Sequence, residues 1–539
     1  MKTLPTAYYH KKTYTWEIPA DLLAEALDRL TFFDEITLRL CPDKPESKTD
    51  HFQLTESEVL SFKFKPFQHQ IEGVNFGLDP ERPKWLLLDS MGLGKTNEII
   101  MYAETLKRRG LIDHCMIICG VDSLRQNWKA EIKKFSTESC IVLGEKISKR
   151  GKVSYETVKK RAEILKQPIS EFFVIVNAAT LRSDEIVEAF KKGPNKFGLI
   201  AVDEVHKFAT KTSAQGGNLL KLGSDFKVAA TGTLIVNNPI SAFPSLKFTD
   251  NDQATLTMYK SQYCSYGGFG NNQIVGYKNL DLLREEIDAC SIRRTLFDVR
   301  TNIPPLTIDV EYLDMEESQQ KFYEAIKDGV KEEADKIQLN ASNLLALTTR
   351  LRQATACPSV LTTQIVDSIK VTRAFEYIEE ITSQGEKVVV FSMFKEPLKQ
   401  LATKLDGFRF SLNTGDTPDD VAMQNMIRFQ EDPDEQVFLG TFGKAGTGFT
   451  LNSSMYLICI DTPYTFSLFE QGYQRIHRIN NERPAFVKVL ICNNTIDERV
   501  HKIIETKKEL GEYLVDGKLS DSQLNNSLAA ELRNIILDL

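Results

Sequence analysis

Short apolar runs alternate with longer amphipathic stretches along this chain, and no other feature constrains its fold as strongly. Such runs are typical of buried strands in a parallel sheet, and the amphipathic stretches are typical of helices that cover its faces. The predicted strands form two clusters, residues 85–88, 116–119, 172–176, 199–202 and 228–230 in the first half, and residues 388–391, 437–440, 456–460 and 487–491 in the second. The sequence therefore predicts an α/β protein with two similar lobes.

The strand clusters and the segments around them divide the chain into four predicted parts. These are an N-terminal accessory region (1–57), a first lobe with a helical insertion (58–303), a helical link with a second lobe (304–520) and a C-terminal helix (521–539). Within them, the glycine-rich stretch 265–273 predicts a loop, and residues 310–356 read as mostly helix.

The tail carries apolar residues at helical spacing, namely Leu524, Leu528, Leu532, Ile535 and Leu539. This stripe predicts a helix that docks on the second lobe. A helix that binds a partner protein is the alternative, and the leader at 1–57 is a second candidate for such binding.

Composition excludes several classes of protein. The chain of 539 residues is 42% hydrophobic and 26% charged, which is ordinary for a soluble globular protein. Its 67 Lys and Arg against 74 Asp and Glu exclude a wholly basic nucleic-acid coat, although a local basic groove remains compatible. Nine cysteines without a C-x-x-C pair favour reduced thiols. No segment has the apolar length of a signal peptide or a membrane span, so a cytoplasmic location is expected, or a nuclear one in a eukaryote.

A glycine-rich segment, DSMGLGKT at residues 89–96, follows the first predicted strand. Glycines such as Gly92 and Gly94 allow a backbone to approach phosphate closely, Lys95 reaches the outer phosphates, and the Thr96 hydroxyl can hold Mg²⁺. The strict phosphate-loop pattern begins with glycine, where this chain has aspartate. Taken alone, the segment is also compatible with a plain turn between a strand and a helix.

Two further strands of the first half also end in polar residues. After residues 199–202 come Asp203 and Glu204, which offer one carboxylate for Mg²⁺ and one to position and deprotonate water. A surface helix cap is the more common role of such a pair. After residues 228–230 comes Thr-Gly-Thr, a turn suited to coupling a nucleotide to movement. All three clusters occur in order at strand ends, where parallel sheets bind ligands, and this favours a nucleotide site.

These segments resemble the Swi/Snf-type ATPases of helicase superfamily II, and the resemblance covers about residues 60–510. The first-half segments that carry it are PFQHQIEGV (66–74), DSMGLGKT (89–96), SLRQNWKAEIKKF (123–135), DEVH (203–206) and ATGTLIVNNP (230–239). The family's own loop also begins with aspartate, and DEVH is close to its DEAH box. Leu234 stands where the family usually has proline.

The second half resembles the same family in KVVVFSMF (387–394), GTFGKAGTGFTL (440–451) and EQGYQRIHRI (470–479). The last of these places Arg475 and Arg478 in the positions of arginine fingers, with Gln471 and His477 in register. Asn480-Asn481 departs from the family's Gly-Gln. Surface salt bridges are the alternative role of the two arginines. The GYKNL portion and the leader's KTYTWEIPADLLAEAL are most similar to the HARP-type annealing helicases.

The resemblance implies two tandem RecA-like lobes with ATP and Mg²⁺ between them. The implied catalytic residues are Lys95, Asp203, Glu204, Arg475 and Arg478. The implied nucleotide-binding residues are Gln70, Gly92, Gly94, Lys95, Thr96 and Gln471, and the implied Mg²⁺ ligands are Thr96 and Asp203.

The implied activity is that of a DNA-dependent ATPase that moves on duplex or branched DNA through backbone contacts. It would re-anneal or remodel branched DNA, or displace bound protein, during DNA repair or replication. A strand-separating helicase is the first alternative. The second is a nucleotide-gated DNA-binding module that serves a partner nuclease or replication complex.

Overall fold

A computed structural model describes the chain over residues 8–10, 15–17, 52–120, 124–147, 153–208, 214–235, 238–252, 254–267, 273–299, 304–336, 341–362, 368–445, 450–478 and 482–511. The chain divides into two compact units, residues 1–51 and residues 52–539. The described part of the first unit is an antiparallel pair, β1 (Tyr8–His10) and β2 (Thr15–Glu17). The predicted C-terminal helix at 521–539 lies outside the described residues, as does most of the leader.

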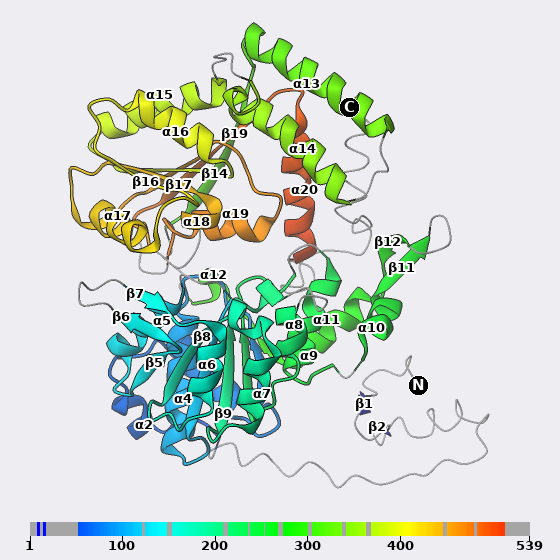
Figure 1. The fold of residues 1–539 in the computed structure, drawn as a ribbon, viewed down its shortest axis with the longest axis vertical. Helices are drawn as coiled ribbons and strands as arrows, with labels where there is room; N and C mark the ends of the chain where they lie inside the picture. Colours follow the sequence, from blue (N-terminus) through cyan, green and yellow to red (C-terminus); the bar gives the residue numbers. More distant parts are fainter. Residues whose placement is uncertain are drawn as a thin grey trace. The chain divides into compact units, whose positions relative to one another are not determined.

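The first lobe contains a seven-stranded parallel sheet with the strand order β13-β3-β10-β9-β4-β8-β5 (Figure 1). Its strands are β3 (Lys84–Leu87), β4 (His114–Cys119), β5 (Cys140–Val142), β8 (Phe173–Asn177), β9 (Phe197–Asp203), β10 (Phe226–Ala230) and β13 (Ser291–Ile292). All five strands predicted for this half are confirmed. The sequence missed β5 and β13, which are short strands at the two edges of the sheet.

Both faces of this sheet are buried, as continuous apolar runs require. Leu86 belongs to the core on one face and Leu87 to the core on the other, because successive side chains of a strand point to opposite sides. Helices of this lobe flank the strands in Figure 1. They are α2 (Glu56–Ser61), α3 (Gln68–Leu78), α4 (Lys95–Arg108), α5 (Leu124–Phe135), α6 (Val158–Leu165), α7 (Asp184–Lys192), α8 (Ala214–Leu219), α9 (Phe243–Phe248), α10 (Leu256–Tyr263), α11 (Leu280–Asp288) and α12 (Leu296–Val299), with short 3₁₀ turns η3 (Ala178–Arg182), η4 (Val205–Phe208) and η5 (Pro239–Ala242).

Two antiparallel hairpins extend the first lobe, β6 (Glu145–Ile147) with β7 (Val153–Tyr155), and β11 (Cys264–Gly267) with β12 (Gln273–Tyr277). The second hairpin corrects the loop predicted at 265–273. Cys264 pairs with Tyr277, so the strands begin in the apolar residues that flank the glycines. The glycine-rich composition concealed them, and residues 268–272 between the strands lie outside the described part of the chain.

The second lobe contains a six-stranded parallel sheet with the order β14-β19-β18-β15-β17-β16. Its strands are β14 (Leu306–Leu313), β15 (Val388–Ser392), β16 (Phe410–Asn413), β17 (Val437–Thr441), β18 (Tyr456–Cys459) and β19 (Ala485–Cys492). All four strands predicted for this half are confirmed, and so is the fold of two parallel-sheet lobes. The helical reading of 310–356 is wrong at its start, because β14 pairs with β19 over eight residues. The sequence also missed β16.

The helices of the second lobe are α13 (Glu317–Lys336), α14 (Ala341–Ala356), α15 (Ile369–Ser383), α16 (Lys395–Lys404), α17 (Asp419–Glu431), α18 (Phe442–Ala445), α19 (Phe466–Tyr473) and α20 (Ile496–Gly511), with a 3₁₀ turn η7 (Pro358–Val360). Helices α13, α14 and α20 share a separate apolar cluster that includes Tyr323, Leu351 and Val500. Two helices that lie between β14 and β15 in the chain thus pack on the helix that follows β19.

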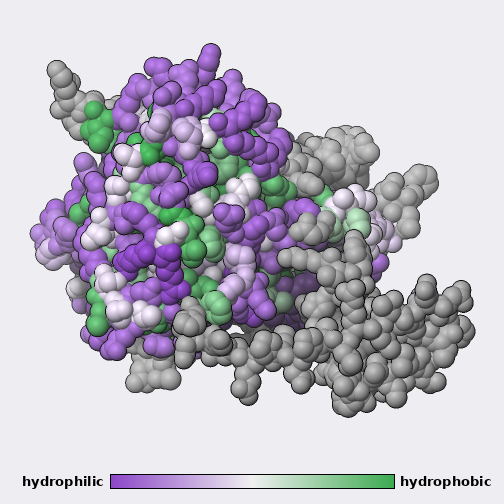
Figure 2. Space-filling view, turned by 90° about the horizontal axis from the view of Figure 1, so that it is seen from below, coloured by the Kyte–Doolittle hydropathy of each residue, from purple (hydrophilic) through white to green (hydrophobic). Residues whose placement is uncertain are grey.

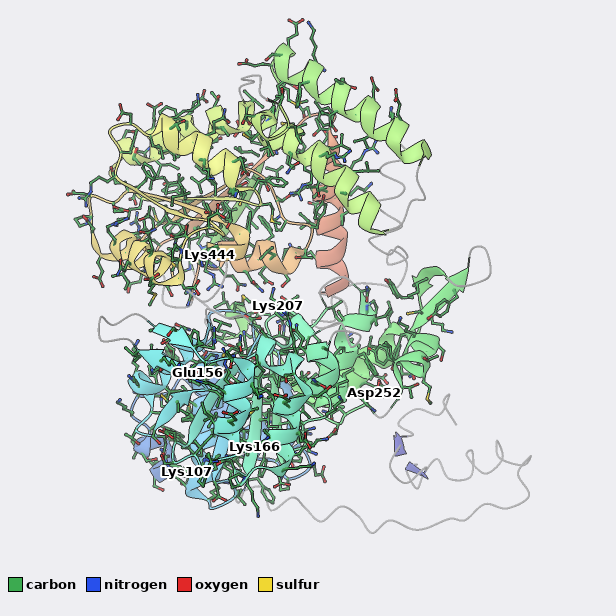
Figure 3. All side chains as sticks on the ribbon, viewed as in Figure 1. Lys107, Glu156, Lys166, Lys207, Asp252 and Lys444 are labelled. Carbon is green, nitrogen blue, oxygen red and sulfur yellow. The ribbon has the colours of Figure 1, made fainter. Side chains whose placement is uncertain are left out.

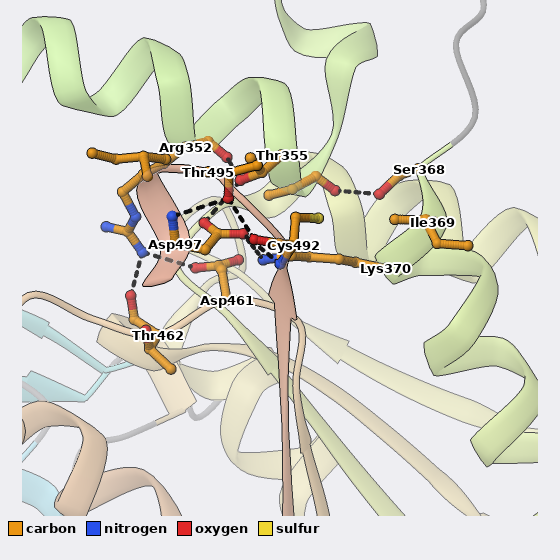
Figure 4. A network of polar contacts seen from close by, with 12 residues as sticks. Arg352, Thr355, Ser368, Ile369, Lys370, Asp461, Thr462, Cys492, Thr495 and Asp497 are labelled. Atoms are coloured by element: carbon orange, nitrogen blue, oxygen red, sulfur yellow. Dashed lines mark hydrogen bonds and ion pairs between the residues drawn. The ribbon is translucent and has the colours of Figure 1, made fainter. Parts of the chain in front are cut away.

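Buried charges join α14 to the segment after β18, and α15 to the start of α20 (Figure 4). The Arg352 guanidinium of α14 donates to the Thr462 carbonyl and lies 3.5 Å from a carboxylate oxygen of Asp461. The Lys370 ammonium of α15 lies 2.6 Å from a carboxylate oxygen of Asp497. Asp461 and Thr462 lie shortly before α19 in the chain. The contacts of Arg352 with these two residues therefore hold the start of the helix that precedes both candidate arginines.

The polarity of the surface agrees with the burial of most apolar side chains in the cores of the two lobes. The face in Figure 2 carries mostly hydrophilic side chains with apolar ones scattered among them, as expected when most large apolar residues lie between sheets and helices. Among the described residues, no helix is long and apolar enough to cross a membrane.

Candidate active site

Residues of both lobes line one cavity of about 240 Å³. The first lobe contributes Met91, Gly92, Gly94, Lys95, Thr96, Asn97, Leu124, Asn127, Glu131, Asp203, Glu204 and Lys207, and the second contributes Thr450, Gln471, Gln474, Arg475 and Arg478. Every residue that the sequence placed in the site is among them except Gln70. Residues 92–96 follow β3, Asp203 ends β9 and Glu204 follows it, so the cavity lies at the carboxyl edge of the first sheet, where parallel sheets bind ligands.

The glycine-rich segment has the backbone geometry of a phosphate-binding loop. Gly92 and Gly94 have φ angles of +85° and +90°, which side chains disfavour, and Gly94 caps the N-terminus of α4. The free N–H groups and the helix dipole there favour an anion. The Lys95 ammonium donates to the Asp89 carbonyl at 2.7 Å and to the Ser90 carbonyl at 3.3 Å. Burial lowers the pKa of Lys95, and the charge of Glu204 opposes this. An incoming phosphate would therefore exchange neutral partners of Lys95 for a charged one.

Gln70 lies beneath the loop and is buried. Its side-chain amide accepts from the Phe67 N–H at 3.0 Å and donates to the Leu93 carbonyl at 3.3 Å. A Cβ on Gly94 would lie 2.4 Å from the Gln70 amide nitrogen, so the contact also requires glycine there. The structure thus places Gln70 as a support of the loop, and its nucleotide-binding role stays a prediction.

Asp203 ends β9, Glu204 follows it, and both line the cavity. Asp203 accepts the Trp128 indole N–H at 2.8 Å with one carboxylate oxygen and the Glu204 N–H at 3.0 Å with the other. Burial and the charge of Glu204 raise the pKa of Asp203. A divalent cation would relieve this electrostatic cost, as expected of a metal-binding carboxylate.

Glu204 is held in an uncommon backbone conformation, with a φ angle of +53°. His206 Nδ1 lies 3.1 Å from a Glu204 carboxylate oxygen and 2.9 Å from the hydroxyl of Thr231 in the Thr-Gly-Thr turn. Burial alone would raise the pKa of Glu204, but the bond to His206 and the charges of His206 and Lys95 lower it overall. Glu204 is therefore ionised near neutral pH, the form that can accept a proton.

Arg475 and Arg478 reach the same cavity from the segment after α19. Burial and the neighbouring Arg478 charge lower the pKa of Arg475, and burial lowers the pKa of Arg478. A Cβ on Gly92 would lie 3.8 Å from Cγ of Arg478, so this arginine passes over the phosphate loop. Gln471 lines the cavity and is 3.5 Å from the Ser467 hydroxyl. An anion would offset the cost of burying these guanidinium groups.

Six polar residues of the cavity were not predicted as site residues, namely Asn97, Asn127, Glu131, Lys207, Thr450 and Gln474. Asn127 and Glu131 are four residues apart on α5 and so share one helix face, and this spacing was the available signal. Lys207 lies at the end of the first lobe that holds the cavity (Figure 3). Gln474 accompanies Gln471 at the end of α19.

A buried ion-pair network explains the aspartate that begins the loop. Asp89 is fully buried, and the Arg294 side chain donates to both of its carboxylate oxygens, at 3.0 and 2.5 Å. Arg294 also donates to buried Glu98 of α4 at 2.7 Å and to the His69 carbonyl of α3. Gly73 leaves room for the network, because a Cβ there would lie 1.8 Å from a Glu98 oxygen. Arg294 thus anchors the loop to the residues just before the second lobe.

Replacement of Arg294 by methionine is expected to lower the free energy of unfolding by about 3–5 kcal/mol, because Asp89 and Glu98 would stay buried without their cation. The measurement is chemical denaturation. Arg284→Met is the matched control, since Arg284 pairs with Asp288 on the exposed surface of α11, and a loss below about 1 kcal/mol is expected there. Equal losses in the two variants would contradict an anchoring role for Arg294.

Comparison with known proteins agrees with this geometry. Residues 69–360 match the family described as SNF2-related domain. This chain belongs to the SNF2-related family. Residues 371–480 match the helicase conserved C-terminal domain, which covers most of the second sheet and the arginine segment. The likeness to the HARP-type subgroup stays a prediction.

Relatives of this SNF2-related chain include an "Uncharacterized ATP-dependent helicase" of Mycoplasma pneumoniae, 26% identical over 93% of the chain and 46% of the relative. Another is ATP-dependent helicase fft1 of Schizosaccharomyces pombe, 23% identical over 90% of the chain and 58% of the relative. The chain spans about half the length of the first of these. A solved structure, the Sulfolobus solfataricus SWI2/SNF2 ATPase core in complex with dsDNA, matches 85% of the chain and 94% of its own at 21% identity and a TM-score of 0.38.

Proposed function

We propose that this SNF2-related chain is an ATP-driven DNA translocase, which hydrolyses ATP between its lobes and moves on duplex or branched DNA. One observation carries the proposal: the phosphate loop, the two carboxylates and the two arginines line a single cavity. Membership of the SNF2-related family, the match to the helicase conserved C-terminal domain and the helicase names of its relatives support it. Remodelling or re-annealing of branched DNA, or displacement of bound protein, is the expected outcome of such movement.

The residues of the cavity fit ATP with Mg²⁺. The described part of the chain contains no group of three or more His, Cys, Asp or Glu side chains that could hold a metal by itself. Mg²⁺ in nucleotide sites needs only one or two protein ligands, because phosphates and water complete its shell. Asp203 and the Thr96 hydroxyl would hold it. When bound, Mg²⁺ neutralises charge on the β- and γ-phosphates.

The protein's own groups then take distinct roles in hydrolysis. Glu204, ionised and oriented by His206, orients the attacking water and accepts its proton. Lys95 leaves the carbonyls of its own loop and donates to the β- and γ-phosphates. Arg475 and Arg478 stabilise the charge that develops on the transferring phosphoryl group.

The two lobes are expected to move relative to each other because both contribute residues to the ATP site. ATP bridges groups of both lobes, so it has a higher affinity for the closed arrangement, and loss of the γ-phosphate weakens that preference. If each lobe grips DNA phosphates, cycles of closure produce stepping that is insensitive to sequence and strongly salt-dependent. Lys129 and Lys444 are weak candidates for this grip, since they pair with Glu145 and Asp419.

The proposal is tested by the ATPase rate with no DNA, single-stranded DNA, duplex DNA and forked DNA. We expect duplex or forked DNA to raise kcat at least about tenfold, with stimulation that falls as salt rises. ATP and DNA binding without stimulated turnover would instead support the nucleotide-gated binding module that serves a nuclease or replication complex.

A pair of displacement assays separates translocation from unwinding. A translocase removes the third strand of a DNA triplex without separating the duplex beneath it. A strand-separating helicase releases a strand from a forked duplex. We expect triplex displacement without strand release, and residues 1–57 or 521–539 are the candidate sites for a protein partner that modifies this outcome.

A further inference from the structure

The strongest unassigned contact near the cavity joins Trp128 of α5 to Asp203. The indole Nε1 donates to a carboxylate oxygen of Asp203 at 2.8 Å. The ring is 1% exposed and belongs to the apolar core on one face of the first sheet. An indole N–H only donates, and a closely packed ring cannot turn away from its acceptor. The core of the lobe thus fixes the orientation of a carboxylate at the edge of the cavity.

We propose that Trp128 is a positioning residue, which orients Asp203 for Mg²⁺ through the indole hydrogen bond. This rests on the proposed function, in which Asp203 holds the ion. The other carboxylate oxygen accepts the Glu204 N–H at 3.0 Å, so one donor holds each oxygen of a carboxylate that lines the cavity. Without the indole donor the carboxylate can rotate into several orientations. Only some of these orientations can bind Mg²⁺, so binding becomes weaker.

The size of the effect follows from other metal sites. Loss of a hydrogen bond that orients a metal ligand typically costs 10–100-fold in metal affinity. Such a loss should not change the phosphate loop itself, because Trp128 is not among the residues that line the cavity. The inference therefore predicts weaker Mg²⁺ binding at unchanged affinity for nucleotide alone.

Trp128→Phe tests this, since phenylalanine keeps the aromatic packing and removes the donor. Trp85→Phe is a matched control, because Trp85 is also 1% exposed and lies in the same core, and its indole is not bonded to a cavity carboxylate. ADP binding is titrated against Mg²⁺ and repeated in EDTA. We expect a Mg²⁺ midpoint about 10–100-fold higher in Trp128→Phe, a midpoint within twofold of wild type in Trp85→Phe, and equal affinities in EDTA. Equal midpoints in the two variants would overturn the inference.

A second experiment tests the same inference in a protein that keeps Trp128. The chain has three tryptophans, so Trp16→Phe/Trp85→Phe leaves Trp128 as the sole indole emitter. We expect its emission to change when Mg²⁺ is added to the ADP-bound protein, and to stay constant with ADP in EDTA. Constant emission in both conditions would overturn the inference even if Trp128→Phe fails to fold. Wild-type protein that binds ADP identically with and without Mg²⁺ would overturn both this inference and the metal site of the proposed function.

Discussion

Replacement of Arg475 by alanine is expected to lower the kcat of ATP hydrolysis by about 10³–10⁵-fold, the range seen when an arginine finger is lost. The guanidinium is buried in the shared cavity and faces the same space as the phosphate loop. Its interaction with phosphate strengthens as charge develops on the transferring group, so its loss acts on the transition state more than on bound ATP. ATP affinity is therefore expected to change only a few-fold.

Arg483→Ala is the control for this prediction. Arg483 follows the same segment of the second lobe, but it pairs with Glu386 and its side chain is 54% exposed. The substitution removes the same group at a position outside the cavity lining, and a rate within twofold of wild type is expected. An Arg475→Ala protein that retains more than about a tenth of the wild-type kcat would contradict the role proposed for Arg475.

Replacement of Lys95 by alanine is expected to lower kcat by about 10²–10³-fold and to weaken ATP binding as well. Lys95 is the first residue of α4 and reaches the loop carbonyls that surround the phosphate position. Unlike Arg475, it contacts phosphate in both the ground state and the transition state, and so both binding and turnover should suffer. The two variants are thus distinguished by ATP affinity as well as by rate.

Lys107→Ala provides the matched control on the same helix. Lys107 lies in the last turn of α4 and pairs with Glu138, away from the cavity lining (Figure 3). Hydrolysis within twofold of wild type is expected, with ATP binding unchanged. If Lys95→Ala binds and hydrolyses ATP as well as Lys107→Ala does, the glycine-rich segment is not the phosphate site.

The sequence predicted those elements that a short contiguous stretch of residues identifies. Each buried strand is a short apolar run bounded by polar residues, and the loop, the carboxylate pair and the arginine segment are contiguous motifs. It missed β5 and β13 because edge strands of two or three residues carry no pattern. It read the start of 310–356 as helix, although β14 is a half-exposed edge strand that is defined by its pairing with β19.

The contacts that sequence reasoning missed join residues far apart in the chain. Arg294 is 205 residues from Asp89, and Trp128 is 75 residues from Asp203. Nothing near either residue reveals its partner, because only the folded sheet brings β13 beside β3 and α5 over the end of β9. Gln70 was placed in the site by resemblance, whereas its bond to the Leu93 carbonyl depends on how α3 meets the loop.

The central claim is that one nucleotide is held by both lobes at once. An experimental structure with a non-hydrolysable ATP analogue and Mg²⁺ tests it most directly. The account predicts γ-phosphate oxygens within about 3 Å of both the Lys95 ammonium and the guanidinium of Arg475 or Arg478. A nucleotide seated on the first lobe alone, with both guanidinium groups beyond hydrogen-bond reach of its phosphates, would contradict it.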